Sequence, residues 1–144
     1  MEADRNAPVF SEGEISVAAS AERVWDILAD FENWPSWNAE INSVTLEGPM
    51  APGTVFRWKA GSTKIVSTLR EVDRPNRLSW TGRTMGIDAI HVWHFRPSNG
   101  GATVSMQESF SGLVAKLLRK KLQRDLDVTT ANGLAALKAA AERA

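Results

Sequence analysis

A long segment without proline at the C-terminus constrains the fold of this chain more than any other feature. From Leu113 to about Arg143 the sequence is rich in alanine and places leucines at helical spacing. These leucines are Leu118, Leu122, Leu126, Leu134 and Leu137. About 30 residues in one helix extend about 45 Å, whereas a domain of this length has a radius of gyration of about 14 to 15 Å. We therefore expect one helix that crosses the whole domain and needs an apolar partner of similar length.

Short β-like runs separated by turn signals occupy most of the chain before that helix. We expect strands over residues 9–17, 41–47, 54–60, 63–73, 77–84, 87–96 and 102–111. The connections between the last six are short, which favours an antiparallel meander. Only a sheet of this size is large enough to cover the helix. The sequence therefore predicts an α+β fold in which a curved seven-stranded antiparallel sheet wraps around a long C-terminal helix.

Between the first two strands the sequence predicts a capped amphipathic helix followed by a tryptophan-rich hinge. Ser20 is a capping residue, and apolar residues recur at helical spacing over residues 21–31. Pro35 is expected to stop the helix, and a second short helical turn is expected over residues 34–39. We expect the tryptophans of this region to fix the hinge to the sheet edge rather than to contact a ligand. These are Trp25, Trp34 and Trp37.

The same region carries a resemblance to a known superfamily. Residues 15–41, ISVAASAERVWDILADFENWPSWNAEI, resemble the opening of the polyketide cyclase/dehydrase and lipid-transport branch of the START-related, birch-pollen-allergen-like superfamily, often labelled SRPBCC. Further matching segments are LREVDRPNRLSWTG at 69–82 and HVWHFRPSNGGATVSMQESFSG at 91–112. The resemblance implies the helix-grip fold with two short helices after the first strand and an internal cavity. It also implies a single ligand-binding domain over residues 1–144 with an ordered core from about 8 to 143. Because this superfamily includes carriers, receptors, cyclases and co-chaperones, the resemblance does not imply one function.

Composition and missing motifs exclude several functional classes. The chain has 17 basic and 17 acidic residues and no net charge, so no nucleic-acid partner is expected. It has no cysteine for disulfide or thiolate chemistry, and it has neither a GxGxxG nor a GxSxG motif. The two histidines, His91 and His94, are three positions apart on a predicted strand and point to opposite faces, which makes a poor zinc pair. We therefore expect no metal and no cofactor.

The distribution of apolar residues also bears on location. No apolar run approaches the roughly 20 residues needed to span a bilayer, so no integral membrane association is expected. The first residues, MEADRNAPVF, lack the apolar run of a secretion signal. A cytoplasmic protein is the resulting expectation.

Side-chain alternation predicts which residues of each strand face the helix. In strands 54–60 and 77–84 the inward residues are Phe56, Trp58, Leu78 and Trp80. In strand 102–111 they are Val104, Met106, Glu108 and Phe110. This assignment places a carboxylate inside the fold.

Two strands have less regular alternation. In strand 87–96 both faces carry apolar residues, and we choose as inward the face with the greater aromatic bulk. That face consists of Ala89, His91, Trp93 and Phe95. In strand 63–73 the inward face stays open, because two apolar residues lie on each side. These are Ile65 and Leu69 on one side and Val66 and Val72 on the other.

The inward residues define a candidate ligand site that is large, aromatic and mostly apolar. Its expected ligand-binding residues are Phe56, Trp58, Trp80, His91, Trp93, Met106, Glu108, Phe110, Leu118 and Leu122. A buried carboxylate is costly unless it is paired, hydrated or protonated, and His91 is the nearest expected partner of Glu108. The leading hypothesis is binding of a small hydrophobic or amphipathic molecule, such as a lipid, a polyketide or an aromatic metabolite.

Other interpretations stay open at this point. The resemblance also implies a cofactor-independent cyclase/dehydrase, in which His91 and Glu108 would be catalytic residues that transfer protons. A filled core with a satisfied histidine–carboxylate contact is the structural alternative to any site. A third function is that of a protein-interaction module, which would use the sheet edge or the basic face of the C-terminal helix.

Two further features have alternative interpretations. The basic residues of the C-terminal helix are expected on a solvated face, with contact to anionic lipid headgroups or a ligand phosphate as the alternative. They are Lys116, Arg119, Lys120, Lys121 and Arg124. The loop 47–53 and the turn at Met85-Gly86 are expected to be ordinary hairpin loops, with a place at the cavity mouth as the alternative.

Overall fold

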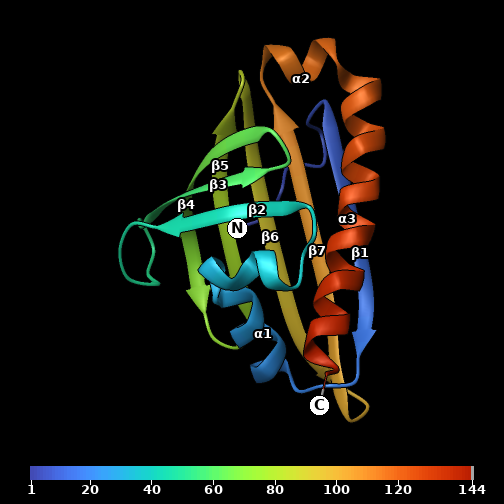
Figure 1. Cartoon of the computed structure of the whole chain (residues 1–144). Coiled ribbons are helices and arrows are strands. Elements are labelled where there is room, and N and C mark those ends of the chain that lie inside the picture. The colour runs from blue at the N-terminus through green and yellow to red at the C-terminus, as the bar shows by residue number, and fades with distance from the viewer. Residues whose placement is uncertain (144) are drawn as a thin grey trace.

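The computed structural model describes residues 1–143 and contains seven strands in one antiparallel sheet. The strands are β1 (Val9–Val17), β2 (Ile41–Leu46), β3 (Val55–Ala60), β4 (Thr63–Asp73), β5 (Arg77–Thr84), β6 (Ile87–Ser98) and β7 (Gly101–Ser111). Their order across the sheet is β1-β7-β6-β5-β4-β3-β2, so the first strand pairs with the last. The sheet curves around the C-terminal helix (Figure 1). The predicted helix-grip architecture is confirmed, and Ala144, the last residue of the expected domain, lies outside the described residues.

The helix that follows β1 is shorter than expected. α1 (Ala21–Ala29) begins after Ser20, whose side-chain oxygen accepts a hydrogen bond from a backbone amide of the first turn. It ends before Asp30, which has φ −82° and ψ 72° and so leaves the helical conformation. The prediction that this helix continues to Phe31 and is stopped by Pro35 is therefore wrong. Pro35 lies inside η1 (Phe31–Ser36), a 3-10 helix that overlaps the second turn expected over residues 34–39 and begins three residues earlier.

The C-terminal helix is bent, which corrects the expected single helix. It consists of α2 (Leu113–Leu117) and α3 (Arg119–Ala141), and Leu118 between them has φ −105° and ψ 26°. α2 packs on the turn between β5 and β6, where a Cβ on Gly86 would lie 2.9 Å from Cγ2 of Val114. The chain bends at Leu118 because α2 packs on this turn, whereas α3 runs back along the sheet (Figure 1).

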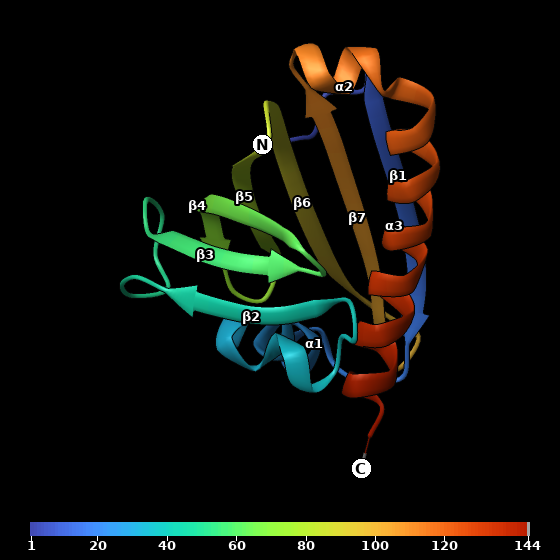
Figure 2. The ribbon, with the colours of Figure 1, turned by 45° about the horizontal axis from the view of Figure 1, so that its top comes forward.

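α3 lies along β1 and inside the curve of the sheet (Figure 2). Its buried residues are Leu126, Thr130, Leu134, Leu137, Ala140 and Ala141. Gly13 of β1 permits close approach, because a Cβ there would lie 2.8 Å from Cδ1 of Leu134. Near the end of the helix, Nζ of Lys138 donates a hydrogen bond of 2.7 Å to the carbonyl oxygen of Ser16. No helix of residues 1–143 combines the length and the apolar character that crossing a bilayer requires.

The inward faces of β3, β5, β6 and β7 agree with the predicted alternation. Phe56, Leu78 and Val104 have no exposed surface, and they are part of the main hydrophobic core. Phe95 of β6 is buried in the same core, so the aromatic face chosen for this strand is the inward one. Side-chain alternation is therefore sufficient to orient β3, β5 and β7, and β6 needs aromatic bulk as a second criterion.

The irregular alternation of β4 has a structural cause. The register between β4 and β5 shifts between Leu69 and Glu71, which marks a β-bulge. Leu69 is buried before the bulge, and Val72 packs against the same core after it. Val66 is 40% exposed and faces outward. One extra residue thus allows odd-numbered and even-numbered positions of one strand to face the same core.

The first residues of the chain lie on the outer face of the sheet. The sequence predicts an ordered core only from about residue 8. The amino group of Met1 lies 3.3 Å from Oε1 of Glu71, and the amide of Ala3 donates to Oε1 of Gln107 at 3.4 Å. Val92, the register partner of Gln107, is fully buried on this face. The N-terminal segment therefore covers part of the sheet opposite α3.

Candidate functional site

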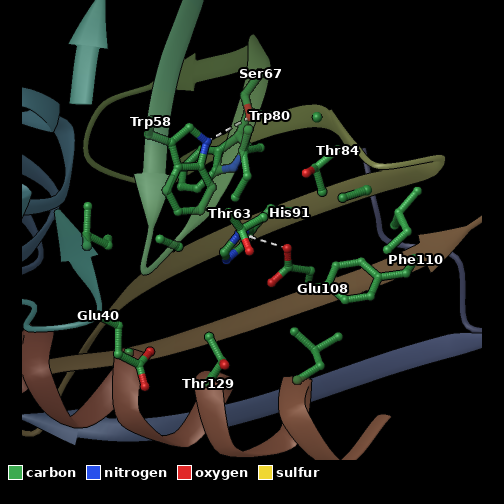
Figure 3. A pocket seen from close by; sticks show the side chains of 18 of the residues that line it. Glu40, Trp58, Thr63, Ser67, Trp80, Thr84, His91, Glu108, Phe110 and Thr129 are labelled. Carbon is green, nitrogen blue, oxygen red and sulfur yellow. Dashed lines mark hydrogen bonds and ion pairs between the residues drawn. The ribbon is translucent and has the colours of Figure 1, made fainter. Parts of the chain in front are cut away.

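A cavity of about 310 Å³ lies between the inner face of the sheet and α3 (Figure 3). Strands β2 to β7 supply most of its wall, and the rest comes from α1, η1 and the segment that follows it, the turn between β5 and β6, and α3. Its aromatic residues are Trp34, Trp37, Trp58, Trp80, Trp93 and Phe110, and its aliphatic residues include Ile41, Ile65, Ile87, Met106, Leu122 and Leu126. This volume is at the lower end of the range of small-molecule sites, which is about 300 to 1,000 Å³.

Eight of the ten predicted ligand-binding residues line this cavity. They are Trp58, Trp80, His91, Trp93, Met106, Glu108, Phe110 and Leu122. The strand residues in this set come from β3, β5 and β7, whose orientation follows from alternation, and from β6, whose orientation also requires the criterion of aromatic bulk. Their common placement follows from the antiparallel register, which aligns Trp80, His91 and Glu108 in one row across the sheet.

The other two predicted residues lie outside the lining. Phe56 faces inward but is covered, since its ring centroid lies 4.7 Å from that of Phe31 and 5.7 Å from that of Trp80. It is therefore a core residue beneath the cavity wall. Leu118 is 48% exposed at the bend between α2 and α3. Its predicted place in the site assumed a continuous helix, and the bend turns it away.

Two tryptophans that were expected only to brace the hinge also line the cavity. Nε1 of Trp34 donates a hydrogen bond of 2.8 Å to the Leu28 carbonyl, so this ring does fix the hinge. Its other side faces the cavity, 5.7 Å from the ring centroid of Trp58. Trp37 follows the end of η1, and its amide donates a hydrogen bond of 3.1 Å to the Trp34 carbonyl, so the two residues are one 3-10 turn apart. The spacing of the two tryptophans was the sequence signal for a shared face.

His91 and Glu108 are direct register partners on β6 and β7, and both side chains point into the cavity (Figure 3). Nδ1 of His91 lies 3.5 Å from Oε2 of Glu108, and no hydrogen bond joins the two groups. The imidazole lies between two indoles, with its centroid 4.6 Å from that of Trp80 and 5.6 Å from that of Trp93. The predicted neighbourhood of the two polar residues is therefore present.

Burial determines the protonation of this pair. Desolvation raises the pKa of Glu108 from 4.5 to about 8, and it lowers the pKa of His91 from 6.5 to about 3. At neutral pH the carboxyl is therefore protonated and the imidazole is neutral. Glu108 then has an O–H donor, whereas His91 has one donor nitrogen and one acceptor nitrogen. The pair forms an uncharged polar patch in an apolar wall.

Four buried nitrogen atoms of the cavity wall have no hydrogen-bond partner within residues 1–143. They are Nε1 of Trp37, Nε1 of Trp93 and both ring nitrogens of His91. Leaving a buried polar group unpaired costs about 1 to 3 kcal/mol, so such groups are uncommon in folded proteins. An indole N–H can only donate. The side chains of these residues line the cavity, so a small movement of the rings would let these groups bond to an acceptor of an occupant.

Besides Glu108, three residues of the wall have charged side chains, Glu40, Arg83 and Asp125, and none of them is buried. Arg83 has a side chain that is 84% exposed and pairs with Asp88 at 2.8 Å. Asp125 accepts a hydrogen bond of 2.6 Å from Lys121. Within residues 1–143, no three His, Asp or Glu side chains are grouped so that they could hold a metal ion. The chemistry that this site can perform thus depends on apolar contact, neutral hydrogen bonds and the His91–Glu108 pair.

Comparison with solved structures places this fold among known proteins. A hypothetical protein of Helicobacter pylori, jhp0584, has a TM-score of 0.85 at 18% identity, over 96% of this chain and 90% of the other. A START superfamily protein of Mycobacterium smegmatis has a TM-score of 0.74 at 16% identity, over 92% and 97% of the two chains. The di-domain ARO/CYC protein StfQ of the steffimycin biosynthetic pathway has a TM-score of 0.79 at 17% identity, over 93% of this chain and 50% of that one. These similarities establish a common fold.

The sequence itself gives the family. No curated protein matches the chain. A family model described as polyketide cyclase/dehydrase and lipid transport matches residues 10–142, which is nearly the whole chain. The resemblance inferred from residues 15–41 is thereby confirmed. This chain belongs to the polyketide cyclase/dehydrase and lipid-transport family.

Proposed function

We propose that this protein binds one small, uncharged and largely apolar molecule in the cavity and orients it through oxygen atoms of that molecule. The unpartnered nitrogens of Trp37, His91 and Trp93 carry this proposal. They are buried in a largely apolar wall, and an acceptor on the ligand would satisfy them. A family whose description covers polyketides and lipids is consistent with such a ligand.

The proposal specifies an uncharged ligand because the wall has no buried charge to pair with an ionised group. Glu108 and His91 are both neutral in the folded protein at pH 7, owing to the pKa shifts that burial causes. Arg83 is mostly exposed and already paired with Asp88. A carboxylate ligand would lose its hydration without gaining a buried cation, which is unfavourable.

A matched pair of probes tests the role of the hydrogen-bond donors. 9-Fluorenone and fluorene have the same ring system, but only the ketone has an acceptor oxygen. We expect 9-fluorenone to quench tryptophan emission and to bind about fivefold more tightly than fluorene, since one net hydrogen bond contributes about 1 kcal/mol. Substitution of Trp93 by Phe and of His91 by Phe together should reduce this difference. Equal affinities of the two probes would contradict the proposed orientation.

A second pair of variants tests the location. Gly133 of α3 lines the cavity, and no atom lies within 4 Å of the position its Cβ would take. Gly133→Leu is therefore expected to fill part of the cavity and to abolish 9-fluorenone binding, whereas Gly133→Ala should retain it. Both variants should fold, because alanine and leucine favour helix over glycine. Undiminished binding by a folded Gly133→Leu protein would place the ligand elsewhere.

Cyclase/dehydrase catalysis is a second candidate, and the adjacent His91 and Glu108 favour it. In dehydration of a β-hydroxyketone, neutral His91 would accept the α-proton as the C–O bond breaks, and protonated Glu108 would donate its proton to the departing hydroxyl, which leaves as water. Glu108→Gln and His91→Phe are then each expected to abolish dehydration of an aromatic β-hydroxyketone. Each should still bind fluorene, which needs neither residue. Turnover that persists in both variants would exclude this mechanism.

A further inference from the structure

The bend between α2 and α3 carries a cluster of exposed apolar side chains, which we call the α2 tip. Seven large apolar residues are strongly exposed among residues 1–143, and four of them lie here. They are Leu113 (70% exposed), Leu117 (73%), Leu118 (48%) and Met85 (73%) of the adjoining turn. α2 stands at one end of the molecule, opposite α1 (Figures 1 and 2). Such a concentration is unusual for a surface that only contacts water.

The position of Met85 adds a second observation. Met85 and Gly86 form the turn between β5 and β6, with φ of 45° and 75°. The turn between β6 and β7 has the same left-handed backbone with Asn99 and Gly100, at φ 38° and 80°. Asparagine tolerates this conformation well, whereas an unbranched apolar residue rarely occupies it. The chain therefore has an exposed methionine at a position where a polar turn residue would be easier to accommodate.

Basic residues surround this cluster. Residues 113–124 contain five of the 17 basic residues of the chain and none of the 17 acidic ones. The five are Lys116, Arg119, Lys120, Lys121 and Arg124, and all are exposed. Lys121 pairs with Asp125, but the other four form no ion pair with any residue in 1–143. The surface around the α2 tip is thus strongly positive, although the chain as a whole has no net charge.

We propose that the α2 tip docks this protein on bilayers that contain anionic lipids. The exposed leucines and Met85 would enter the interface, and the surrounding lysines and arginines would contact headgroup phosphates. Interfacial binding of amphipathic segments combines these two contributions, apolar burial and attraction to anionic lipid. The charge favours a lipid surface over a second copy of this chain, because two identical positive tips repel each other.

Docking in this orientation would bring the cavity to the membrane. Met85 and Leu122 belong to the cavity lining, and Leu122 lies one turn of helix beyond Leu118. Met85 is largely exposed, so it is at the rim of the cavity. The apolar rim and the α2 tip are thus one continuous surface. An apolar ligand could pass between bilayer and cavity there with less exposure to water.

Co-sedimentation of the full chain with vesicles tests the proposal. We expect binding to vesicles of phosphatidylcholine with 30% phosphatidylglycerol, and at least about tenfold weaker binding to phosphatidylcholine alone. Lys120→Gln should weaken binding to the anionic vesicles about fivefold, and Leu117→Gln at least as much. Two matched controls, Arg143→Gln near the other end of the helix and Val128→Gln on an exposed face of α3, should change it less than twofold.

Several outcomes would overturn the proposal. These are absence of binding to the anionic vesicles, equal binding to both kinds of vesicle, or equal losses in control and tip variants. Sedimentation equilibrium gives a further test. A dimer that dissociates in the Leu117→Gln variant would mean that the apolar cluster binds a second copy of the chain. Binding of 9-fluorenone should be unchanged in Lys120→Gln, so failure of the docking proposal is distinguishable from failure of the cavity proposal.

Discussion

Replacement of Glu108 by glutamine is expected to stabilise the folded protein at neutral pH. Burial raises the pKa of this carboxyl from 4.5 to about 8, so the folded chain keeps a proton at pH 7 that the unfolded chain has lost. Because the pKa is higher in the folded state, the stability linked to this proton is fully present below pH 4.5 and is lost as the pH rises toward 8. Glutamine has the same shape, stays neutral at every pH and removes this loss.

The expected magnitude follows from the interval between pH 4.5 and pH 7. At about 1.36 kcal/mol per pH unit, the wild-type carboxyl costs about 3 kcal/mol of the free energy of unfolding at pH 7. The Glu108→Gln variant should therefore exceed the wild type by about 3 kcal/mol at pH 7 and by almost nothing at pH 4. In a chain of this size that difference at pH 7 corresponds to about 6 to 12 °C in melting temperature.

Urea unfolding of both proteins at pH 4, 5, 6 and 7 measures this difference directly. A gap that opens steadily with pH supports a buried, protonated carboxyl. A variant that is less stable than the wild type at pH 7 would refute the reasoning, since it would mean that Glu108 is ionised in the fold and paired with a protonated His91. A gap independent of pH would refute it as well.

Three further substitutions have defined outcomes. Burial lowers the pKa of His91 to about 3, below its unfolded value of 6.5, so stability that is present above pH 6.5 is lost as the pH falls toward 3. His91→Phe should remove this acid sensitivity. Equal losses of stability in the variant and the wild type between pH 7 and pH 4 would contradict this prediction. Gly13→Val would place a side chain against Leu134, whose Cδ1 lies 2.8 Å from the position that the new Cβ would take. This substitution should lower the free energy of unfolding by about 1 to 3 kcal/mol. An unchanged melting temperature would show that α3 has room to move. Arg74→Ala breaks two hydrogen bonds to Asp26, of 2.7 and 2.8 Å, between half-exposed side chains. Thermal unfolding should therefore show that the free energy of unfolding falls by at most about 1 kcal/mol. A larger loss would mean that the pair is shielded from water.

Much of the cavity wall was predictable because a strand has a fixed side-chain period. Once the apolar face of β5 and β7 was recognised, the inward positions of Trp80, Met106 and Glu108 followed from alternation alone. The placement of His91 beside Glu108 needed one further assumption, that aromatic bulk marks the inner face of β6. The structure agrees with that assumption, because the two residues are register partners.

The remaining features depend on contacts between distant segments, which local patterns do not contain. The bulge in β4 inverts the alternation of inward and outward side chains after Leu69, and no residue type at that position indicates a bulge. The bend at Leu118 arises because α2 packs on the turn between β5 and β6, about 30 residues earlier in the sequence. The hinge role expected of Trp34 and Trp37 does not exclude a place in the cavity wall. In the folded chain η1 does both.

A crystal structure of the protein in complex with 9-fluorenone tests the central claim most directly. We expect the ligand between the sheet and α3, with its oxygen within about 2.7 to 3.2 Å of a nitrogen of Trp37, His91 or Trp93. A ligand bound only on the outer surface, or an interior in which side chains fill the space, would contradict the account.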